Sequence, residues 1–170
     1  MKTSLTILAS ILLAWTSASA QQPIHPDPLL DHMTGHWILQ GTIAGREVTH
    51  DIDSDWVLNQ EYVRIHETSR EKNAQGQPVY EAIVFIERDD RTREYKCEWL
   101  DSTAGGGLSG PIAEGKRSGD AILFVFPSED GSGTHTTFVW SRNTDTWQWV
   151  MDNEEGGKLT PFARVQLSRK

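Results

Sequence analysis

The sequence predicts an all-β protein, a single antiparallel up-and-down β-barrel of about ten strands with a short N-terminal helix plugging one end. Polar and apolar residues alternate with a period of two along most of the chain, which is typical of strands with one buried and one solvated face. Clusters of Gly, Asn, Asp, Ser and Pro interrupt this pattern at short intervals and predict tight turns. Since closing a sheet on itself removes its exposed edges, a barrel is the simplest architecture for such a chain.

The first twenty residues have the features of a secretory signal peptide. Lys2 supplies a positive charge, residues 5–15 (LTILASILLAW) are apolar, and residues 18–20 (ASA) are small enough for a cleavage site. The apolar stretch is shorter than the about 20 residues of a membrane-spanning helix. We therefore expect residues 1–20 to be removed, residues 21–27 to lead into the fold, residues 28–170 to form one domain, and the protein to be exported, either to the periplasm or out of the cell.

The charge and cysteine content exclude several classes of protein. The 170 residues carry a formal net charge of −8, and the basic residues form no stripe, so the chain is not expected to bind nucleic acid. No segment after the signal peptide is apolar enough to span a membrane. The only cysteine, Cys97, cannot form an internal disulfide, and its alternation with Tyr95 and Trp99 predicts a small buried side chain.

The predicted helix lies directly before the first strand. Asp27 is a good N-cap, and Pro28 suits the first helical position because no amide hydrogen is needed there. Leu29, Leu30 and Met33 form one apolar patch at helical spacing. Gly35 can adopt the left-handed conformation that ends a helix, and Trp37 follows on the first strand. The sequence therefore predicts an amphipathic helix across one barrel end, with a large aromatic ring just inside it.

The strands that follow are separated by recognisable turns. They are predicted to start near His36, Glu47, Gln60, Val79, Arg93, Ile112, Ala121, His135, Thr146 and Leu159. The alternation also predicts which residues share a face. Examples are His50, Ile52, Ser54 and Trp56 against Asp51, Asp53 and Asp55, and Trp147, Trp149 and Met151 against Gln148.

The helix followed by Gly35-His36-Trp37 resembles the Gly-x-Trp signature of lipocalins and, more broadly, calycins. The chain is most similar to exported bacterial calycin-like proteins of uncharacterised function, and more distantly to the haem-carrying nitrobindins. Of the closely spaced glycines that nitrobindins have in the first strand, only Gly41 is present. The resemblance implies that a basic residue near the chain end packs across Trp37, and Arg164 is the candidate.

Catalytic and metal-binding motifs are not found. No pair of histidines has metal-ligand spacing, and no Gly-x-Ser-x-Gly elbow is present. The three aspartates between Asp51 and Asp55 lack the other ligands of a calcium loop, so a solvated strand face is expected. We predict no catalytic residue and no metal ligand. A histidine that ligates haem stays an alternative, and the six candidates are His25, His32, His36, His50, His66 and His135.

Aromatic residues are the strongest indication of a binding site. Ligand pockets are mostly apolar and aromatic with a few polar groups, and a barrel of more than eight strands has room for a ligand. The predicted lining consists of Trp56, Tyr62, Tyr80 and Trp99.

The sequence therefore favours an exported binding protein, monomeric or homodimeric, that carries a small, partly apolar or amphipathic molecule without a required cofactor. Three alternatives stay open, since one fold can serve many functions. They are a nitrobindin-like haem-binding barrel, a structural envelope protein with a filled barrel, and a hydrolase or isomerase on the same scaffold.

Overall fold

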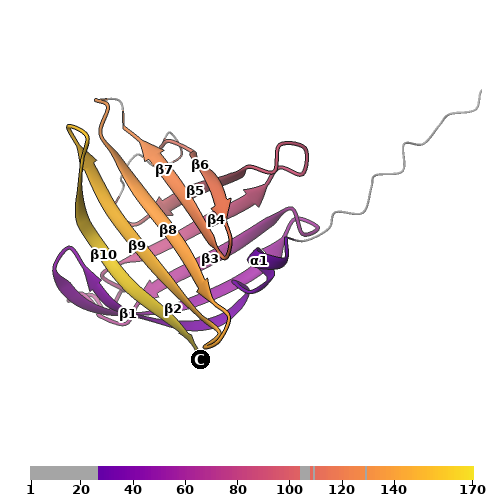
Figure 1. Cartoon of the computed structure of the whole chain (residues 1–170). Coiled ribbons are helices and arrows are strands. Elements are labelled where there is room, and N and C mark those ends of the chain that lie inside the picture. Colours follow the sequence, from indigo (N-terminus) through magenta and orange to yellow (C-terminus); the bar gives the residue numbers. More distant parts are fainter. Residues whose placement is uncertain (1–26, 104–107, 109, 129) are drawn as a thin grey trace, which may run out of the picture.

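The computed structural model describes residues 27–103, 108, 110–128 and 130–170. The predicted signal peptide and most of the lead-in lie outside these residues. The described chain forms one short helix and ten strands, shown in Figure 1. The helix is α1 (Pro28–Asp31), and the strands are β1 (Gly35–Ile43), β2 (Arg46–Val57), β3 (Tyr62–Ser69), β4 (Glu81–Arg88), β5 (Tyr95–Asp101), β6 (Ala113–Ser118), β7 (Ala121–Pro127), β8 (Gly133–Ser141), β9 (Thr146–Glu155) and β10 (Lys158–Arg169).

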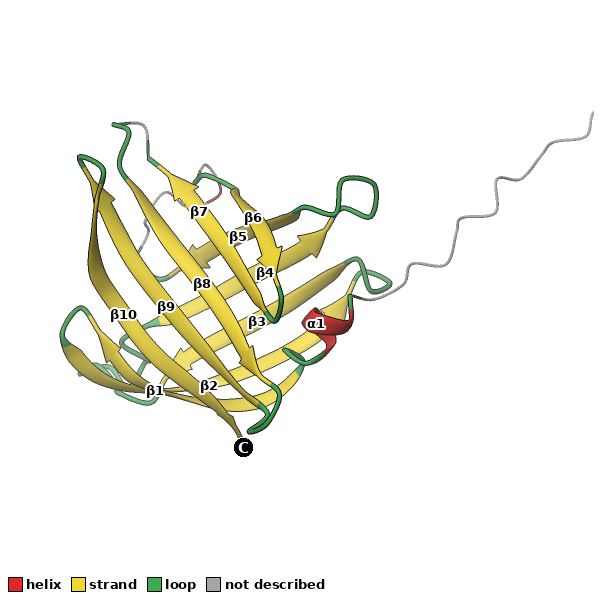
Figure 2. Ribbon diagram, in the orientation of Figure 1, coloured by secondary structure: helices red, strands yellow, loops and turns green. Residues whose placement is uncertain are grey.

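The strands form a closed antiparallel barrel in which each strand pairs with its neighbour in sequence. The last strand, β10, returns to β1 and pairs with it from Trp37 opposite Arg169 to Ile43 opposite Ala163, which closes the sheet. Figure 2 shows the strands wrapped around one interior, with α1 at one end. The predicted all-β barrel of about ten strands is confirmed, and the strand starts agree with the sequence pattern to within a few residues. No helix in the described part of the chain is long and apolar enough to cross a membrane.

Because the strands alternate in direction, the connecting loops fall at two ends of the barrel. We call the end that carries α1 and the β2–β3, β4–β5, β6–β7 and β8–β9 connections the helix end. The opposite end, which we call the mouth, carries the β1–β2, β3–β4, β5–β6, β7–β8 and β9–β10 connections. These two ends differ in how the interior is filled.

Alternation along each strand determines the barrel core. The inward side chains of the helix half are buried and form one hydrophobic cluster, which includes Ile52, Val63, Cys97 and Trp147. Cys97 is fully buried and unpaired, as predicted, and burial raises the pKa of its thiol far above the ordinary value. The predicted outward aspartates lie on the solvated face, where Asp51 contacts Arg70 and Asp55 contacts Arg64.

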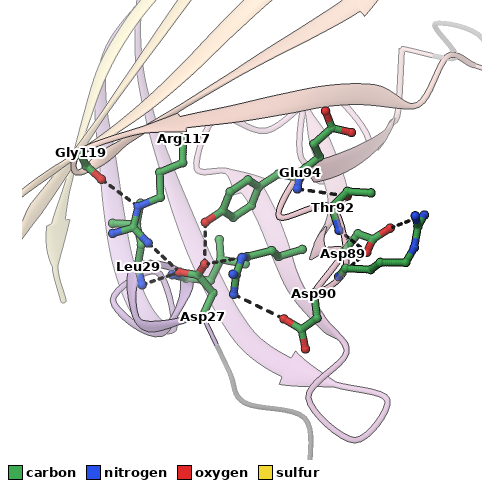
Figure 3. A network of polar contacts seen from close by, with 12 residues as sticks. Asp27, Leu29, Asp89, Asp90, Thr92, Glu94, Arg117 and Gly119 are labelled. Carbon is green, nitrogen blue, oxygen red and sulfur yellow. Dashed lines mark hydrogen bonds and ion pairs between the residues drawn. The ribbon is translucent and has the colours of Figure 1, made fainter.

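The helix end is closed by a buried polar network around Asp27, shown in Figure 3. Asp27 caps α1, as predicted, by accepting a hydrogen bond from the amide of Leu29 at 2.7 Å. The same carboxylate accepts a hydrogen bond from the Tyr95 hydroxyl at 2.6 Å and contacts the guanidinium groups of Arg88 (3.3 Å) and Arg117 (3.2 Å). These contacts connect the start of the fold to β4, β5 and β6, so this carboxylate holds α1, the plug of the helix end, against the barrel wall.

The arginine over Trp37 is Arg169, so the prediction of Arg164 in this place is wrong. The Arg169 guanidinium carbon lies 3.7 Å from the centre of the Trp37 ring. Strand register explains why Arg169 and not Arg164 lies there. Arg169 is paired with Trp37 and occupies an inward-facing position of β10. Arg164 has outward parity, is paired with Thr42, and binds the Asp152 carboxylate and the Met151 carbonyl on β9.

Gly35 has a specific steric role next to this stacked pair. Its φ angle is +118°, and a Cβ atom at this position would lie 2.5 Å from Nη1 of Arg169. That same Nη1 donates a hydrogen bond to the carbonyl of Thr34 at 2.6 Å. The Gly-x-Trp pattern therefore provides the aromatic ring that the arginine covers and the space in which the arginine lies. The helix itself ends earlier than the predicted Gly35, with His32 as its C-cap.

Candidate functional site

The mouth half of the barrel contains a cavity of about 830 Å³. Its walls come from eight of the ten strands and from the mouth loops, and much of its surface is apolar. The apolar side chains include Leu39, Ile43, Val48, Phe126, Met151 and Phe162. A volume of this size lies within the range of about 300–1,000 Å³ that is usual for small-molecule sites. The interior is therefore open at the mouth, whereas it is filled at the helix end.

The polar groups of the cavity gather on the wall formed by β2, β3, the β3–β4 loop and β5. At its centre, Nδ1 of His50 and Oε1 of Glu67 are 2.5 Å apart. Both side chains are buried, with 5% and 2% of their surfaces exposed. A carboxylate in such a place costs free energy unless it is hydrogen-bonded, so His50 offsets part of the cost of burying Glu67.

Tyr80 and Trp99 belong to the same polar wall. The Trp99 indole Nε1 donates a hydrogen bond to the Tyr80 hydroxyl oxygen at 3.0 Å, and the Tyr80 ring stacks on His50 with 5.7 Å between centroids. Burial, followed by the negative charge of Glu67, raises the pKa of Tyr80 well above its ordinary value. The hydroxyl therefore keeps its proton. Since Trp99 uses one acceptor position of the oxygen, that proton is available to a ligand.

Several polar atoms of this wall have no partner in the described part of the chain. Nε2 of His50 and Oε2 of Glu67 form no hydrogen bond with any described residue. Among the described residues, Ser54 Oγ and Trp149 Nε1 are the only side-chain N or O atoms that are inaccessible to solvent and also lack a hydrogen-bond partner. The free atoms of His50 and Glu67 therefore reach the cavity, where a ligand can bind them.

The structure brings two of the four predicted lining residues to the cavity, Tyr80 and Trp99. Trp56 faces inward as expected but lies near the helix end, where its Nε1 donates to Oδ1 of Asp31 at 2.7 Å. Tyr62 lies on the outer face of β3, against the Phe85 ring. Neither residue contributes to the cavity lining. Trp56 lies too far along β2 toward the helix end, and Tyr62 occupies an outward-facing position of β3.

The sequence prediction named His50 only as one of six candidate haem ligands, not as a residue of the predicted lining, and it did not name Glu67. A signal for both was present, because strand alternation gives His50 the same face as Ile52, and Glu67 the same face as Val63 and Ile65. A charged residue that alternates with buried aliphatic residues is expected to face the interior. Its presence there indicates a function other than packing.

The other described histidines lie outside the cavity lining. Three of them form cross-strand pairs with carboxylates, namely His36 with Asp53, His66 with Glu81, and His135 with Glu154. His32 stacks on Trp140 at the helix end. Within the described ranges, no group of three or more His, Cys, Asp or Glu side chains is placed to hold a metal ion.

No protein-family model matches this chain, and a search of curated proteins found no match.

Proposed function

We propose that the protein binds a small, partly apolar molecule non-covalently in the mouth cavity. The observation that carries this proposal is the cavity of about 830 Å³, bordered by aromatic and aliphatic side chains, directly above a densely filled half-barrel. Protein interiors are normally packed like organic crystals, so an interior space of this size is not a packing defect. Removing apolar surface from water contributes about 25 cal/mol per Å², which can supply micromolar affinity after the costs of association.

The distribution of polar groups indicates an amphipathic ligand. The walls from β1, β7, β9 and β10 are mainly apolar, with Leu39, Phe126, Met151 and Val165, while His50, Glu67 and Tyr80 lie together on the facing wall. A molecule with an apolar body and one polar group satisfies both walls. The apolar body accounts for affinity, and the polar group fixes the orientation.

We further propose that the protein is a calycin-like carrier exported from the cell. The closed ten-stranded barrel, the N-terminal plug and the Trp37–Arg169 stack support the calycin part of this proposal. Export rests on the signal-peptide features of residues 1–20. The intact mass of the protein recovered from the periplasm or medium tests it, with Gln21 expected as the first residue.

Haem binding is a second candidate, favoured by one observation. His50 is a cavity histidine whose Nδ1 is held by a carboxylate and whose Nε2 is free, and this is an arrangement that suits a metal-bound imidazole. His50 would hold the iron, and bound haem would supply redox or gas-binding chemistry. A visible absorbance band that appears on titration with haemin, and that disappears in His50→Ala, would favour this candidate.

The cavity is tested directly with N-phenyl-1-naphthylamine, an uncharged apolar dye whose fluorescence rises in apolar surroundings. We expect saturable binding that Trp99→Leu weakens by about tenfold, because a buried aromatic contact is worth about 1–2 kcal/mol. Trp56→Leu is the matched control, since both indoles are inward and each donates one hydrogen bond, but only Trp99 lines the cavity. Absence of dye binding to the wild type, or equal loss in both variants, would contradict the proposed function.

A further inference from the structure

Building on the binding function proposed above, we infer that the ligand carries a positively charged nitrogen, an amine or quaternary ammonium group, held between Glu67 and Asp101. Strand register, the charges of the cavity wall and the aromatic rings beside them favour this class of ligand.

Strand register brings the two carboxylates to the same level of the barrel. Glu67 on β3 is paired with Ala82 on β4, and Ala82 is paired with Asp101 on β5. Neighbouring strands lie about 4.8 Å apart, and all three residues have inward parity. The small Ala82 therefore separates two acidic side chains that border one space.

Glu67 is the more informative of the two, because its side chain is only 2% exposed. One of its oxygens is bonded to His50, and the other accepts no hydrogen bond from any described residue. A buried carboxylate with a free oxygen is expensive unless a partner completes its coordination. A ligand N–H⁺ group in the cavity supplies both the hydrogen bond and the opposite charge.

The positive residues of the cavity lining are already paired at the mouth. Arg46 lies 3.7 Å from Glu71, and Arg70 forms a bidentate contact with Asp51 at 2.7 and 2.9 Å. No lysine is among the described residues that line the cavity. Apart from His50, no positively charged side chain in the described lining is therefore free to neutralise Glu67 and Asp101.

Aromatic rings border the same space and favour a cation in a second way. Tyr80 lies two residues from Ala82 on the same face, and Trp99 lies two residues from Asp101 on the same face of β5. Trp149 packs edge-on against Trp99, with 6.2 Å between ring centroids. The faces of such rings are electronegative and attract ammonium groups, most strongly where water is excluded.

The electrostatic environment of Tyr80 is consistent with this arrangement. After burial, the charges of Glu67 and Asp101 both raise the pKa of its phenol, so both carboxylates act on the same point of the cavity wall. A metal ion is not the expected occupant, because the described residues bring together no set of three ligating side chains. An organic cation with an apolar tail matches both the acidic wall and the apolar wall.

The test uses three competitors with the same eight-carbon tail and different head groups, namely octylammonium, 1-octanol and octanoate, against bound N-phenyl-1-naphthylamine at pH 7. We expect octylammonium to displace the dye at a concentration at least about tenfold lower than either of the others. Glu67→Gln keeps the shape of the side chain and removes its charge, so this preference should be lost. Glu81→Gln is the matched control because Glu81 forms the same kind of pair with His66, at 2.7 Å, on the outer face.

The outcomes separate this inference from the proposed function. Dye binding with equal or better displacement by octanoate or octanol overturns the cation inference but leaves a binding cavity. A preference that persists in Glu67→Gln and in Asp101→Asn also overturns it. Absence of dye binding to the wild type overturns the proposed function itself. If circular dichroism shows that Glu67→Gln does not fold, Asp101→Asn is the second variant that removes a charge.

Discussion

The two ends of this barrel use buried carboxylates in opposite ways. At the helix end, Asp27 is surrounded by the Leu29 amide, the Tyr95 hydroxyl and two guanidinium groups, so both of its oxygens are bound. At the mouth, Glu67 is as deeply buried but has only His50 as a partner among the described residues, and an open cavity lies beside it. A fully coordinated buried carboxylate stabilises a fold, whereas an incompletely coordinated one is available to a ligand.

Tryptophan shows the same contrast. Trp37 and Trp147 at the helix end are completely buried, and their indole N–H groups donate to the backbone carbonyls of Met33 and His32. Trp99 at the mouth is only partly buried and donates to a side-chain hydroxyl in the cavity wall. The indoles of the helix end are therefore part of a packed core, whereas Trp99 borders the cavity.

The largest expected effect is on stability at the helix end. Trp37→Ala should lower the free energy of unfolding by about 3–5 kcal/mol, because it leaves a large hole in a packed core and removes the surface that Arg169 covers. Trp99→Ala at the mouth should cost only about 1–2 kcal/mol, since its ring already borders an open space. Urea unfolding followed by circular dichroism measures both. Equal losses would remove the distinction between the two ends.

The next largest effect on stability is expected where Asp27 holds α1, the plug, against the barrel. Asp27→Ala should lower the free energy of unfolding by about 2–4 kcal/mol, because it removes a helix cap and leaves Arg88, Arg117 and Tyr95 without their shared partner. Asp55→Ala is the control on the outer wall, where the exposed pair with Arg64 should contribute at most about 1 kcal/mol. Thermal unfolding of the two variants side by side gives the comparison. A loss for Asp27→Ala no larger than that of the control would mean that the plug is not fastened by this carboxylate.

The smallest expected effect on stability is that of an ion pair on the outer wall, and it is a reference for the effects at the two ends. Arg70, followed by Lys170, lowers the pKa of Asp51 from 3.8 to about 2. Because the folded-state pKa is depressed, this pair stabilises the protein above about pH 4, and the contribution is lost as the pH falls toward 2. Solvent screening keeps it below about 1 kcal/mol. In urea titrations, the stability difference between wild type and Arg70→Gln should therefore shrink from pH 6 to pH 3, and a constant difference would contradict this.

Much of the fold could be predicted because it depends on local chemistry. Strand alternation placed His50, Ile52 and Trp56 on one face, and Asp27 with Pro28 predicted the start of the helix. Long-range register was not readable in the same way. The choice between Arg164 and Arg169 depends on how β10 aligns with β1, and no local pattern determines that alignment.

The site was predicted less completely for a related reason. Alternation tells whether a side chain faces inward but not at which height of the barrel it lies. Trp56 and Trp99 both face inward, yet only Trp99 borders the cavity. In the strand register Trp56 is level with Cys97, one inward position closer to the helix end than Trp99, and its indole reaches Asp31 instead. The pairing of His50 with Glu67 requires the β2–β3 register, in which Glu67 is opposite Ile52, diagonal to the histidine.

The indole N–H signals of the protein offer the most direct measurement, since the six described tryptophans are distributed over both ends. In a titration of ¹⁵N-labelled protein with N-phenyl-1-naphthylamine, the signals of Trp99 and Trp149 at the mouth should shift. Those of Trp37, Trp56, Trp140 and Trp147 should remain in place. Shifts that centre on Trp37 and Trp147, or signals that do not move at any dye concentration, would contradict a binding site at the mouth of the barrel.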